Sequence, residues 1–334
     1  MINVGIIGAG MMGRVHAESL QRLDQGKLVL VADPSGAKLE AIQNAFGVEG
    51  TRNSSQVIES PEIQAVIIAT PTPLHFAWVS AALEAGKHVF CEIPLARETN
   101  QGEHLVRLAH EKGLVLTINH SMRGFYEFKT LHDRARDGTV GDLGVIRLSR
   151  RTPHPRNWYS EFEISGGVIL DAMIHDLDFL LWTCGPVERV TCKGMCRSGD
   201  IRKLDYALAV VRHVSGAIAH VESSWCHYGQ YAVEFEIAGD KGLMTYDNLD
   251  DSIPLRVSII DVTQSGRKYA TESPILDTAY MRLLRGFLCA VEGTGPNPVP
   301  PEEALASLKL ALAAISSARS GAPVDLQPSR GGVE

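Results

Sequence analysis

The sequence predicts an α/β protein with an N-terminal doubly wound parallel sheet and a C-terminal α+β domain that has a large, mostly antiparallel open sheet. About the first 120 residues alternate short β-branched runs with helical periods, at the spacing of βαβ units. After Phe125, several strand-like runs follow one another without helices between them, which is typical of an antiparallel sheet. A length of 334 residues also fits two domains of roughly 150 residues each. We therefore expect domains at 1–122 and 123–334, with closing helices that can pack back on the first.

The predicted elements of the first domain are short and regularly spaced. Strands are expected at Asn3–Ile7, Leu28–Ala32, Ala65–Ala69, His88–Cys91 and Leu114–Ile118, and helices at Met12–Leu23, Ala37–Phe46, Leu74–Ala85 and Gln101–Lys112. Because a helix separates most successive strands, the strands should be parallel, with their carboxyl ends at one edge of the sheet.

The second domain opens with a helix that ends before Gly138 and a strand at Val145–Ser149, followed by the proline- and aromatic-containing loop Thr152–Tyr159. A helix is predicted at Asp171–Thr183. Further strands are expected at Val187–Met195, Tyr206–His213, Ala217–Ser224, Tyr231–Ala238 and Leu243–Tyr246, and closing helices at Thr278–Glu292 and Glu302–Ser320.

Composition and charge exclude several classes of protein. Lys and Arg number 32 against 39 Asp and Glu, a formal net charge of −7, which argues against long-range attraction to nucleic acid or an anionic membrane. No apolar run approaches the roughly 18 residues that span a bilayer, and the N-terminus lacks the basic region of a secretory signal. Six cysteines without an ordered pattern predict reduced thiols and no metal site. We expect a cytoplasmic protein that binds neither nucleic acid nor membrane.

A glycine-rich turn follows the first strand and opens the first helix, which is the context that the Rossmann dinucleotide fingerprint requires. Gly8 permits the tight turn, Gly10 lets a pyrophosphate approach the backbone, and Gly13 lets helix and strand pack closely. The helix N-terminus offers free N–H groups to phosphates. The expected cofactor-binding residues of this turn are Gly8, Gly10, Met11, Met12 and Gly13.

Asp33 ends the second strand about twenty residues after Gly13, where a carboxylate accepts hydrogen bonds from the adenosine ribose hydroxyls. This pairing predicts a Rossmann domain that binds NAD in preference to NADP. NADP would be accommodated if Ser35 or Lys38 received its 2′-phosphate. Without a cofactor, the same residues would form a glycine turn and an Asp helix cap near Pro34.

Two further loops follow predicted strands, at the edge where a doubly wound sheet binds ligands. The first holds Thr70, Pro71 and His75, and His75 either faces the cofactor or lies in solvent on the first turn of a helix. The second holds Glu92 and Pro94. We expect all five residues at the cofactor.

The segment from Gly166 to Asp178 carries the predicted chemistry of the second domain. Asp171 and His175 are four residues apart, so they share one face of a helix, about 40° apart around its axis. The carboxylate can orient the imidazole, which makes His175 a candidate general base. Three other interpretations stay open: a metal site that adds Asp178, a buried histidine satisfied by Asp171, and a surface pair without a role.

These motifs resemble the Gfo/Idh/MocA family, the relatives of glucose-fructose oxidoreductase and inositol dehydrogenase. The resemblance covers nearly the whole chain and depends most on Gly-Gly-x-x-x-Asp-x-x-x-His-x-x-Asp from Gly166. It implies a reversible oxidation of a cyclitol, sugar or polyol hydroxyl by NAD. His175 would take the hydroxyl proton with support from Asp171. It also implies a homodimer or homotetramer formed through the C-terminal sheet. Candidate substrate contacts are Asn157, Trp158 and Tyr228.

One position departs from the family pattern. The family usually has Glu-Lys-Pro, whereas this chain has Glu92-Ile93-Pro94, and isoleucine can neither donate a hydrogen bond nor stabilise an alkoxide. The cations considered as substitutes for this lysine at the substrate are His120, Arg123 and Lys203.

The departure from Glu-Lys-Pro also leaves two alternative functions open. One is a dehydrogenase of cyclic hemiacetals formed from aromatic-cleavage semialdehydes, although such relatives lack the Gly-Gly-x-x-x-Asp helix. The other is a protein that binds NAD and a metabolite without turnover.

Overall fold

The computed structural model describes residues 1–155, 157–196, 204–250, 255–259 and 277–326, with the main chain alone at 157 and 255–259. The chain divides into two compact units. The first contains Met1–Phe125, helix α9 (Ala279–Val291) and the residues that follow it up to Leu305. The second begins at Tyr126 and takes up the chain again at Ala306.

Six parallel strands form the sheet of the first unit within the described residues, in the order β3-β2-β1-β4-β5-β6. Their bounds are β1 Ile2–Ile7, β2 Gly26–Ala32, β3 Glu49–Thr51, β4 Ala65–Ile68, β5 His88–Cys91 and β6 Leu116–Ile118. Val4 of β1 pairs with Leu28 on one side and with Ala65 on the other, so the strand order reverses between β1 and β4. Doubly wound sheets bind ligands at this point, beyond the carboxyl ends of the strands.

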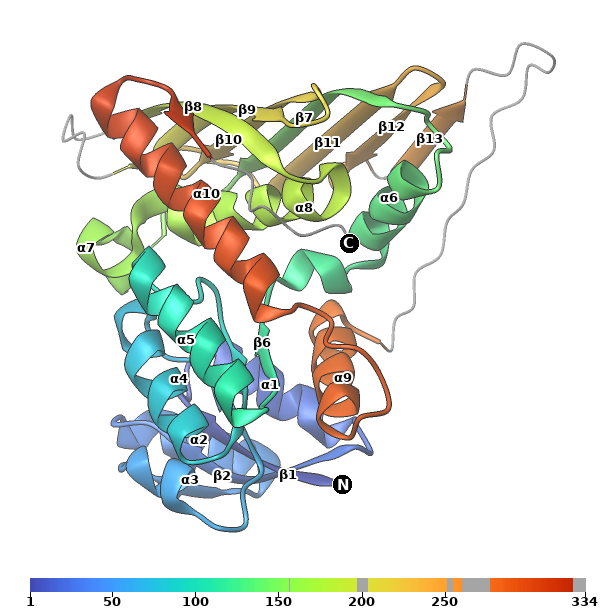
Figure 1. Cartoon of the computed structure of the whole chain (residues 1–334). Helices are drawn as coiled ribbons and strands as arrows, with labels where there is room; N and C mark the ends of the chain where they lie inside the picture. The colour runs from blue at the N-terminus through green and yellow to red at the C-terminus, as the bar shows by residue number, and fades with distance from the viewer. Residues whose placement is uncertain (156, 197–203, 251–254, 260–276, 327–334) are drawn as a thin grey trace. The chain divides into compact units, whose positions relative to one another are not determined.

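Helices cover this sheet and complete its core (Figure 1). They are α1 Met11–Gln21, α2 Gly36–Phe46, α3 Ser55–Glu59, α4 His75–Glu84 and α5 Thr99–Lys112, with short 3-10 turns η1 Thr72–Leu74 and η2 Ser121–Gly124. Helix α9 adds the buried side chains of Leu284, Phe287 and Leu288, and the Phe287 ring lies 5.5 Å from that of Phe90. All four residues of β4 are fully buried, as expected for a parallel strand covered on both faces.

A second sheet of eight strands, counted over the described residues, organises the second unit in the order β13-β12-β11-β7-β10-β9-β8-β14. The bounds are β7 Leu143–Arg151, β8 Val187–Met195, β9 Tyr206–His213, β10 Ile218–Ser224, β11 Ala232–Gly239, β12 Gly242–Asp247, β13 Leu255–Ile259 and β14 Val324–Asp325. Strands β7 and β10 pair in parallel, and the other neighbours pair antiparallel. This confirms the predicted fold class, an α/β protein with a parallel sheet followed by a mostly antiparallel one.

Helices and turns of this unit are α6 Tyr126–Arg136, η3 Asn157–Ser160, α7 Phe162–Ser165, η4 Ile169–Met173, α8 Ile174–Cys184 and α10 Pro301–Ser320, whose first residues belong to the first unit. Helices α6 and α8 lie on one face of the large sheet (Figure 1). There, Phe128 of α6 and Phe179 of α8 both place their rings within 5.1 Å of the ring of Phe235 in β11.

The other face of the large sheet points its side chains outward. In β9 buried and exposed residues alternate, so that Leu208 and Val210 are 40% and 41% exposed. Ile218 of β10 and Val145 of β7 are 40% and 37% exposed. The sheet therefore has one covered face and one open, partly apolar face.

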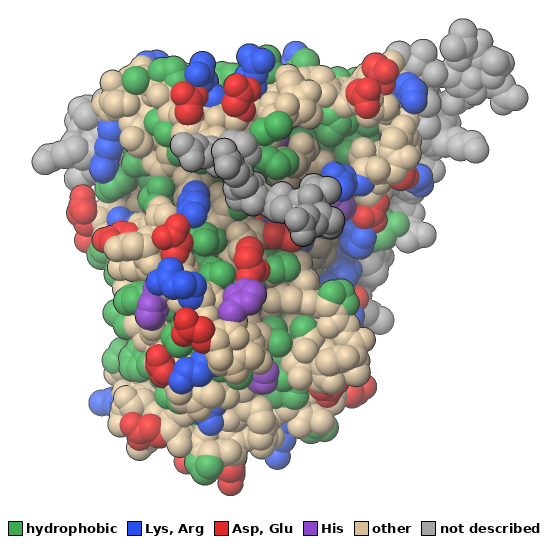
Figure 2. Space-filling view, viewed as in Figure 1, with side chains coloured by type: hydrophobic (Ala, Val, Ile, Leu, Met, Phe, Trp, Pro, Cys, Tyr) green, Lys and Arg blue, Asp and Glu red, His purple; other side chains and the backbone are tan. Residues whose placement is uncertain are grey.

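The described residues carry charges of both signs on the surface. On the side seen in Figure 2, acidic and basic side chains are interspersed. No helix in this part of the chain is both long enough and apolar enough to cross a membrane.

Candidate functional site

The glycines of the turn between β1 and α1 have separate steric roles. Gly8 has a φ of +106°, and a Cβ there would lie 2.3 Å from the carbonyl oxygen of Ala69. A Cβ on Gly13 would lie 1.9 Å from the carbonyl oxygen of Gly8. Gly10 differs, because a Cβ on it would meet nothing within 4 Å. The turn is therefore closely packed at Gly8 and Gly13 and open beside Gly10.

That space lies at the N-terminus of α1, where Gly10 is the N-cap and no side chain caps the helix. The first backbone N–H groups of a helix lack intrahelical acceptors and bind anions. Met11 is 73% exposed and Met12 is half-buried, so these two residues border the turn without closing it. The turn therefore fits the pyrophosphate of a dinucleotide.

Asp33 follows β2 and is 5% exposed. One carboxylate oxygen accepts a hydrogen bond from the backbone N–H of Ala9 at 2.9 Å, and the other accepts one from that of Ser35 at 2.8 Å. Because a carboxylate has about four lone-pair sites, acceptor capacity remains for ribose hydroxyls.

One cation lies beside this carboxylate, and a second packs against Gly36, three residues after Asp33. Lys38 Nζ is 3.9 Å from Asp33 Oδ2. The Arg52 guanidinium packs over Gly36, where a Cβ would lie 2.2 Å from one of its nitrogens. Arg52 could not be predicted from the sequence, because the three-residue strand β3 that precedes it gives no periodic signal.

The loop after β4 offers one polar atom to a ligand. The hydroxyl oxygen of Thr70 is buried and has no hydrogen-bond partner in the described part of the chain. Pro71, the next residue, is half-buried. A buried hydroxyl without a partner is costly unless a ligand or water satisfies it, so Thr70 also fits a bound cofactor.

His75 is buried on the first turn of α4, so the alternative that placed it in solvent is wrong. It is 1% exposed, with Nδ1 2.8 Å from the carbonyl oxygen of Pro94 and Nε2 2.9 Å from that of Thr70. Burial lowers the pKa of the imidazole, against the opposing effect of these carbonyls. The ring joins the loop after β4 to the loop after β5, and its place at the cofactor stays a prediction.

Glu92 follows β5, and two other segments hold its carboxylate. Nε2 of His16, from α1, lies 2.5 Å from Oε1, and Nδ2 of Asn119, after β6, donates to the same oxygen at 2.8 Å. The side chain of His16 is fully buried, whereas that of Glu92 is 13% exposed. Sequence reasoning had not identified His16 or Asn119 as partners of Glu92, because they lie 76 and 27 residues away.

Ile93 and Pro94 continue this loop, and the peptide bond between them is cis. Ile93 packs, partly buried, against the apolar core of the first unit. Pro94 is buried. The position at which the resemblance implies a lysine is therefore apolar.

Two of the three cations considered in place of that lysine are buried. His120 is 1% exposed and Arg123 is 7% exposed. The Arg123 guanidinium forms an ion pair with Glu303, also in the first unit, so its charge is balanced there. Lys203 lies outside the described residues.

In the second unit, paired glycines start the helix that carries Asp171 and His175. Gly167 has a φ of +70°, and a Cβ on it would lie 2.9 Å from the carbonyl oxygen of Leu204. The same carbonyl accepts a hydrogen bond from the N–H of Val168 at 2.9 Å. A glycine here lets the helix begin directly against the chain that leads into β9.

This helix begins earlier than predicted and is not uniform. Its first turn, η4, is a π-helix, and α8 follows. In a π-helix the hydrogen bonds run from residue i to i+5, so a turn takes more than four residues. Asp171 lies in η4 and His175 in α8, so the offset of about 40° expected for a uniform α-helix does not describe this pair. No feature of the sequence distinguishes a π-turn from an α-turn.

Burial along this helix singles out the same two residues. Every residue from Ser165 to Leu180, all of which the structure describes, is buried except Asp171 and His175, which are half-buried. Burial raises the pKa of the Asp171 carboxyl to about 7. A carboxyl that titrates near neutral pH, one turn from an imidazole, is typical of acid–base sites.

Asp178, considered as a third metal ligand, is fully buried, and its Oδ1 accepts a hydrogen bond from the Ser307 hydroxyl at 2.9 Å. Among the described residues, no group of three or more His, Cys, Asp and Glu side chains is arranged to hold a metal ion.

A buried ion pair attaches α8 to the sheet. Arg150, near the end of β7, donates to both carboxylate oxygens of Asp176 at 3.0 and 2.7 Å. Asp176 is fully buried and Arg150 is 5% exposed. Arg150 also donates to the hydroxyl of Tyr231, just before β11. These three residues could not be predicted to meet, because no sequence spacing links them.

Two loops expected to contact the substrate leave the same edge of the large sheet, because β7 and β10 are parallel. The Trp158 ring stacks on that of Tyr159 with centroids 3.8 Å apart, and the main chain of Asn157 opens η3. In the other loop, Tyr228 is 87% exposed.

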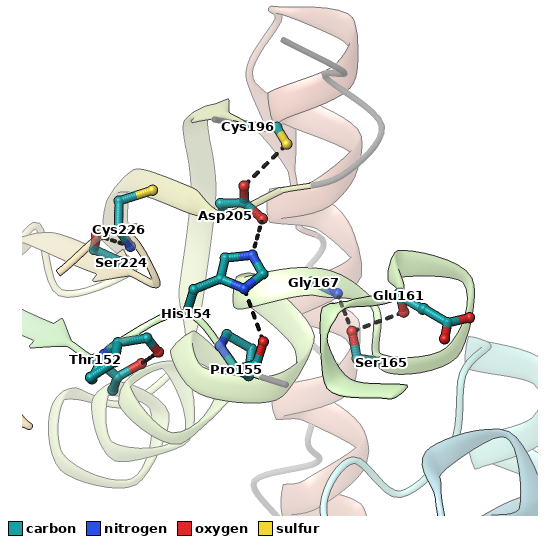
Figure 3. Close-up of polar contacts among 11 residues, drawn as sticks. Thr152, His154, Pro155, Glu161, Ser165, Gly167, Cys196, Asp205, Ser224 and Cys226 are labelled. Atoms are coloured by element: carbon teal, nitrogen blue, oxygen red, sulfur yellow. Dashed lines mark hydrogen bonds and ion pairs between the residues drawn. The ribbon is translucent and has the colours of Figure 1, made fainter. Parts of the chain in front are cut away.

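The base of the first loop is held by a carboxylate. Figure 3 shows Asp205, which precedes β9, between Cys196 and His154. Its oxygens lie 3.1 Å from the Cys196 Sγ and 3.4 Å from the His154 Nε2. Thr152 further ties the loop to β10 by donating its N–H to the carbonyl of Ser224 at 2.8 Å.

Comparison with known proteins identifies both units. A family model described as an oxidoreductase family with an NAD-binding Rossmann fold matches residues 2–120. A model of the GFO/IDH/MocA C-terminal domain matches residues 128–245. The chain belongs to the Gfo/Idh/MocA oxidoreductase family. The family resemblance, the Rossmann fold and the oxidoreductase class that we predicted are thereby confirmed.

Individual members of this family are similar over nearly their whole length. Myo-inositol 2-dehydrogenase from Thermotoga maritima is 28% identical over 335 residues, which covers 98% of this chain and 99% of the relative. The 1,5-anhydro-D-fructose reductase of Ensifer adhaerens is 28% identical and covers 97% of this chain and 98% of the relative. A solved structure of GenD2 from gentamicin A biosynthesis, in complex with NAD, aligns with a TM-score of 0.86 at 25% identity, covering 98% of this chain and 96% of that one.

Proposed function

We propose that this member of the Gfo/Idh/MocA family reversibly oxidises a secondary hydroxyl of a cyclitol, sugar or related polyol, with NAD as the oxidant. The observation that carries the proposal is the Asp171–His175 pair, the two accessible side chains of an otherwise buried helical stretch. The relatives support the substrate class, since one is a myo-inositol 2-dehydrogenase and another a 1,5-anhydro-D-fructose reductase.

His175 is the proposed general base. Its imidazole accepts the proton of the substrate hydroxyl, and the Asp171 carboxyl orients the ring from one turn earlier. With a pKa of about 7, Asp171 can exchange a proton with its neighbour near neutral pH. The metal interpretation of this pair has less support, because Asp178 already bonds to Ser307.

Residues of the first unit would bind the cofactor. Gly8, Gly10 and Gly13 would receive the pyrophosphate, and the Thr70 hydroxyl would gain a partner. When bound, NAD supplies the hydride acceptor at C4 of its nicotinamide ring. We infer NAD as the preferred form, because the Asp33 carboxylate would accept hydrogen bonds from ribose hydroxyls and repel a 2′-phosphate.

Trp158 and Tyr228 are the proposed aromatic contacts for the polyol, with Asn157 beside them. Aromatic rings offer a flat apolar surface together with a polar edge, which suits the C–H and O–H groups of a sugar ring. The exposure of Tyr228, 87%, leaves its ring accessible to a ligand.

We also propose that a second copy of the chain covers the open face of the large sheet, giving a homodimer or homotetramer. Val145, Leu208, Val210 and Ile218 supply apolar area there. Ion pairs Arg147–Glu236 and Arg151–Glu234 balance charges on this sheet. A groove of about 460 Å³, lined in part by Arg147, Leu208 and His220, runs along it.

The test of the proposed reaction is turnover by the purified chain with NAD and a panel of cyclitols, sugars and linear polyols, followed by the absorbance of the reduced cofactor. A substrate deuterated at the reacting carbon should transfer deuterium to the cofactor, which mass spectrometry detects. NAD binding without turnover of any panel member would favour the non-catalytic alternative.

A further inference from the structure

We propose that Asp205 is a positioning residue for the polyol. Together with Leu204, it sets the position of the loop after β7 relative to the start of the helix that carries Asp171 and His175. The inference rests on the proposed function and names a residue that determines the affinity for the substrate. Every segment that it involves belongs to the second unit.

The segment before β9 and two loops meet at one edge of the large sheet. Strands β7 and β10 are parallel, so the loops that follow them leave the sheet at the same edge. Strand β9 runs antiparallel to β10 and begins opposite its end, where Tyr206 pairs with Ser224. Leu204 and Asp205 directly precede β9, so they lie at this edge as well.

The side chain of Asp205 contacts the loop after β7 through His154. One carboxylate oxygen lies 3.4 Å from the His154 Nε2, and the other accepts a hydrogen bond from the Cys196 thiol at 3.1 Å (Figure 3). The Nδ1 of the same ring lies 2.9 Å from the carbonyl oxygen of Pro155. The ring of Trp225 packs edge-on against it, with centroids 6.1 Å apart. The His154 ring is therefore held at both nitrogens and on its side.

This side-chain contact matters because the loop has few backbone donors. Pro153 and Pro155 flank His154, and proline has no N–H group to donate. At the base of the loop, the N–H of Thr152 donates to the carbonyl oxygen of Ser224. Beyond that point, the His154 side chain attaches the loop to the segment before β9. A change at Asp205 should therefore reach η3, which carries proposed polyol contacts.

The main chain of the same two residues holds the other segments. The carbonyl oxygen of Leu204 accepts a hydrogen bond from the N–H of Val168 at 2.9 Å, just before η4. The carbonyl oxygen of Asp205 accepts one from the N–H of Trp225 at 2.7 Å, where the loop after β10 begins. One dipeptide thus connects the helix of the proposed acid–base pair with both loops that we expect at the substrate.

A substitution can separate the side-chain contact from the main-chain contacts. Asp205 is 6% exposed, and burying a carboxylate is costly unless polar partners satisfy it, so its contacts should persist in the folded chain. Asp205→Ala removes the contact with His154 but leaves both main-chain hydrogen bonds. It should therefore loosen the loop without moving the helix. Loss of a loop contact made equally before and during the reaction raises KM and leaves kcat unchanged.

The experiment compares wild type, Asp205→Ala, His154→Ala and the double variant at saturating NAD. It measures KM and kcat for the polyol, the NAD dissociation constant, and hydrogen exchange of the loop after β7 by mass spectrometry. Asp205→Asn keeps the side-chain volume and one acceptor, and it takes the place of Asp205→Ala if that variant does not fold. The matched control is Asp240→Ala, since Asp240 accepts a hydrogen bond from the N–H of Asp142 at 2.8 Å, at the other end of β7.

We expect Asp205→Ala to raise the KM for the polyol about tenfold, with kcat within about twofold and NAD binding unchanged. Asp205→Asn should raise KM less. Hydrogen exchange in the loop should become faster in Asp205→Ala and stay the same in Asp240→Ala. Because Asp205 acts through His154, its loss should have no further effect in the His154→Ala background.

Three results would overturn the inference: unchanged exchange in the loop, a KM no higher than that of Asp240→Ala, or effects of the two substitutions that add. A wild type that turns over no polyol would overturn the proposed function instead. The exchange rates of the loop would then decide the positioning role by themselves.

Discussion

Asp33 is the residue that we propose to determine which nucleotide the first unit prefers. An asparagine there keeps an acceptor for the Ala9 N–H but loses the charge that would face a 2′-phosphate, while Lys38 stays 3.9 Å away. We predict that Asp33→Asn lowers the preference for NADH over NADPH by about ten- to a hundredfold, measured by fluorescence titration. Equal wild-type affinities for the two nucleotides would contradict the role given to Asp33.

The raised pKa of Asp171 links stability to pH. In the folded chain the pKa is about 7, above the value of about 3.9 for an unfolded chain, so the folded state binds the proton more tightly. This contribution to the free energy of unfolding is complete below about pH 4 and is lost as the pH rises through 7.

We predict that Asp171→Asn, which cannot titrate, gains up to about 4 kcal/mol of stability relative to the wild type between pH 4 and pH 8. Urea unfolding of both proteins at the two pH values measures this difference. A difference that does not vary with pH would refute the raised pKa.

The attachment of α8 to β7 depends on a pair of buried charges. Asp176→Asn would leave the Arg150 guanidinium buried without its counter-ion, and breaking a buried pair in this way costs about 3–5 kcal/mol. The control is Glu188→Gln, which breaks the exposed Arg212–Glu188 pair and should change the stability far less. Urea unfolding compares the two variants, and an Asp176→Asn protein as stable as the control would show that the pair does not anchor the helix.

Periodicity in the sequence located the long elements well. Strands β5, β8 and β9 begin and end where we predicted them, because runs of β-branched and apolar residues mark each one. Strand β3 and helix α3 were not predicted, because three and five residues are too few to show a period. Strands β13 and β14 at the sheet edges were missed too, and β14 has only two residues.

Part of the candidate site could be predicted from the sequence, and part could not. Local motifs and parallel topology were sufficient to bring Gly10, Asp33, Thr70 and Glu92 to one edge of one sheet. The contacts of Glu92 with His16, and of Arg150 with Asp176, depend on segments paired only in the folded chain. The contacts of His75 could not be predicted for the same reason, since the carbonyl that its Nδ1 contacts belongs to Pro94, 19 residues away.

The assembly of the molecule should depend on the open face of the large sheet. Leu208 and Val210 lie on adjacent outward positions of β9, so glutamates at both would place two charges in the proposed interface. We predict that Leu208→Glu/Val210→Glu converts a dimer or tetramer into monomers that remain folded. Light scattering coupled to size-exclusion chromatography measures the mass, and a wild-type monomer or an unchanged oligomer in the variant would contradict this interface.

The proposed reaction uses cofactor residues of the first unit and His175 of the second, so one substitution can separate binding from turnover. His175→Asn retains a polar side chain but cannot take the proton of a hydroxyl near neutral pH. The decisive measurement is the rate of NAD reduction with the best polyol, in wild type and in His175→Asn, alongside the NAD dissociation constant of each. We predict unchanged NAD binding and a loss of turnover of about 10²- to 10⁴-fold, whereas full turnover in the variant would contradict His175 as the base.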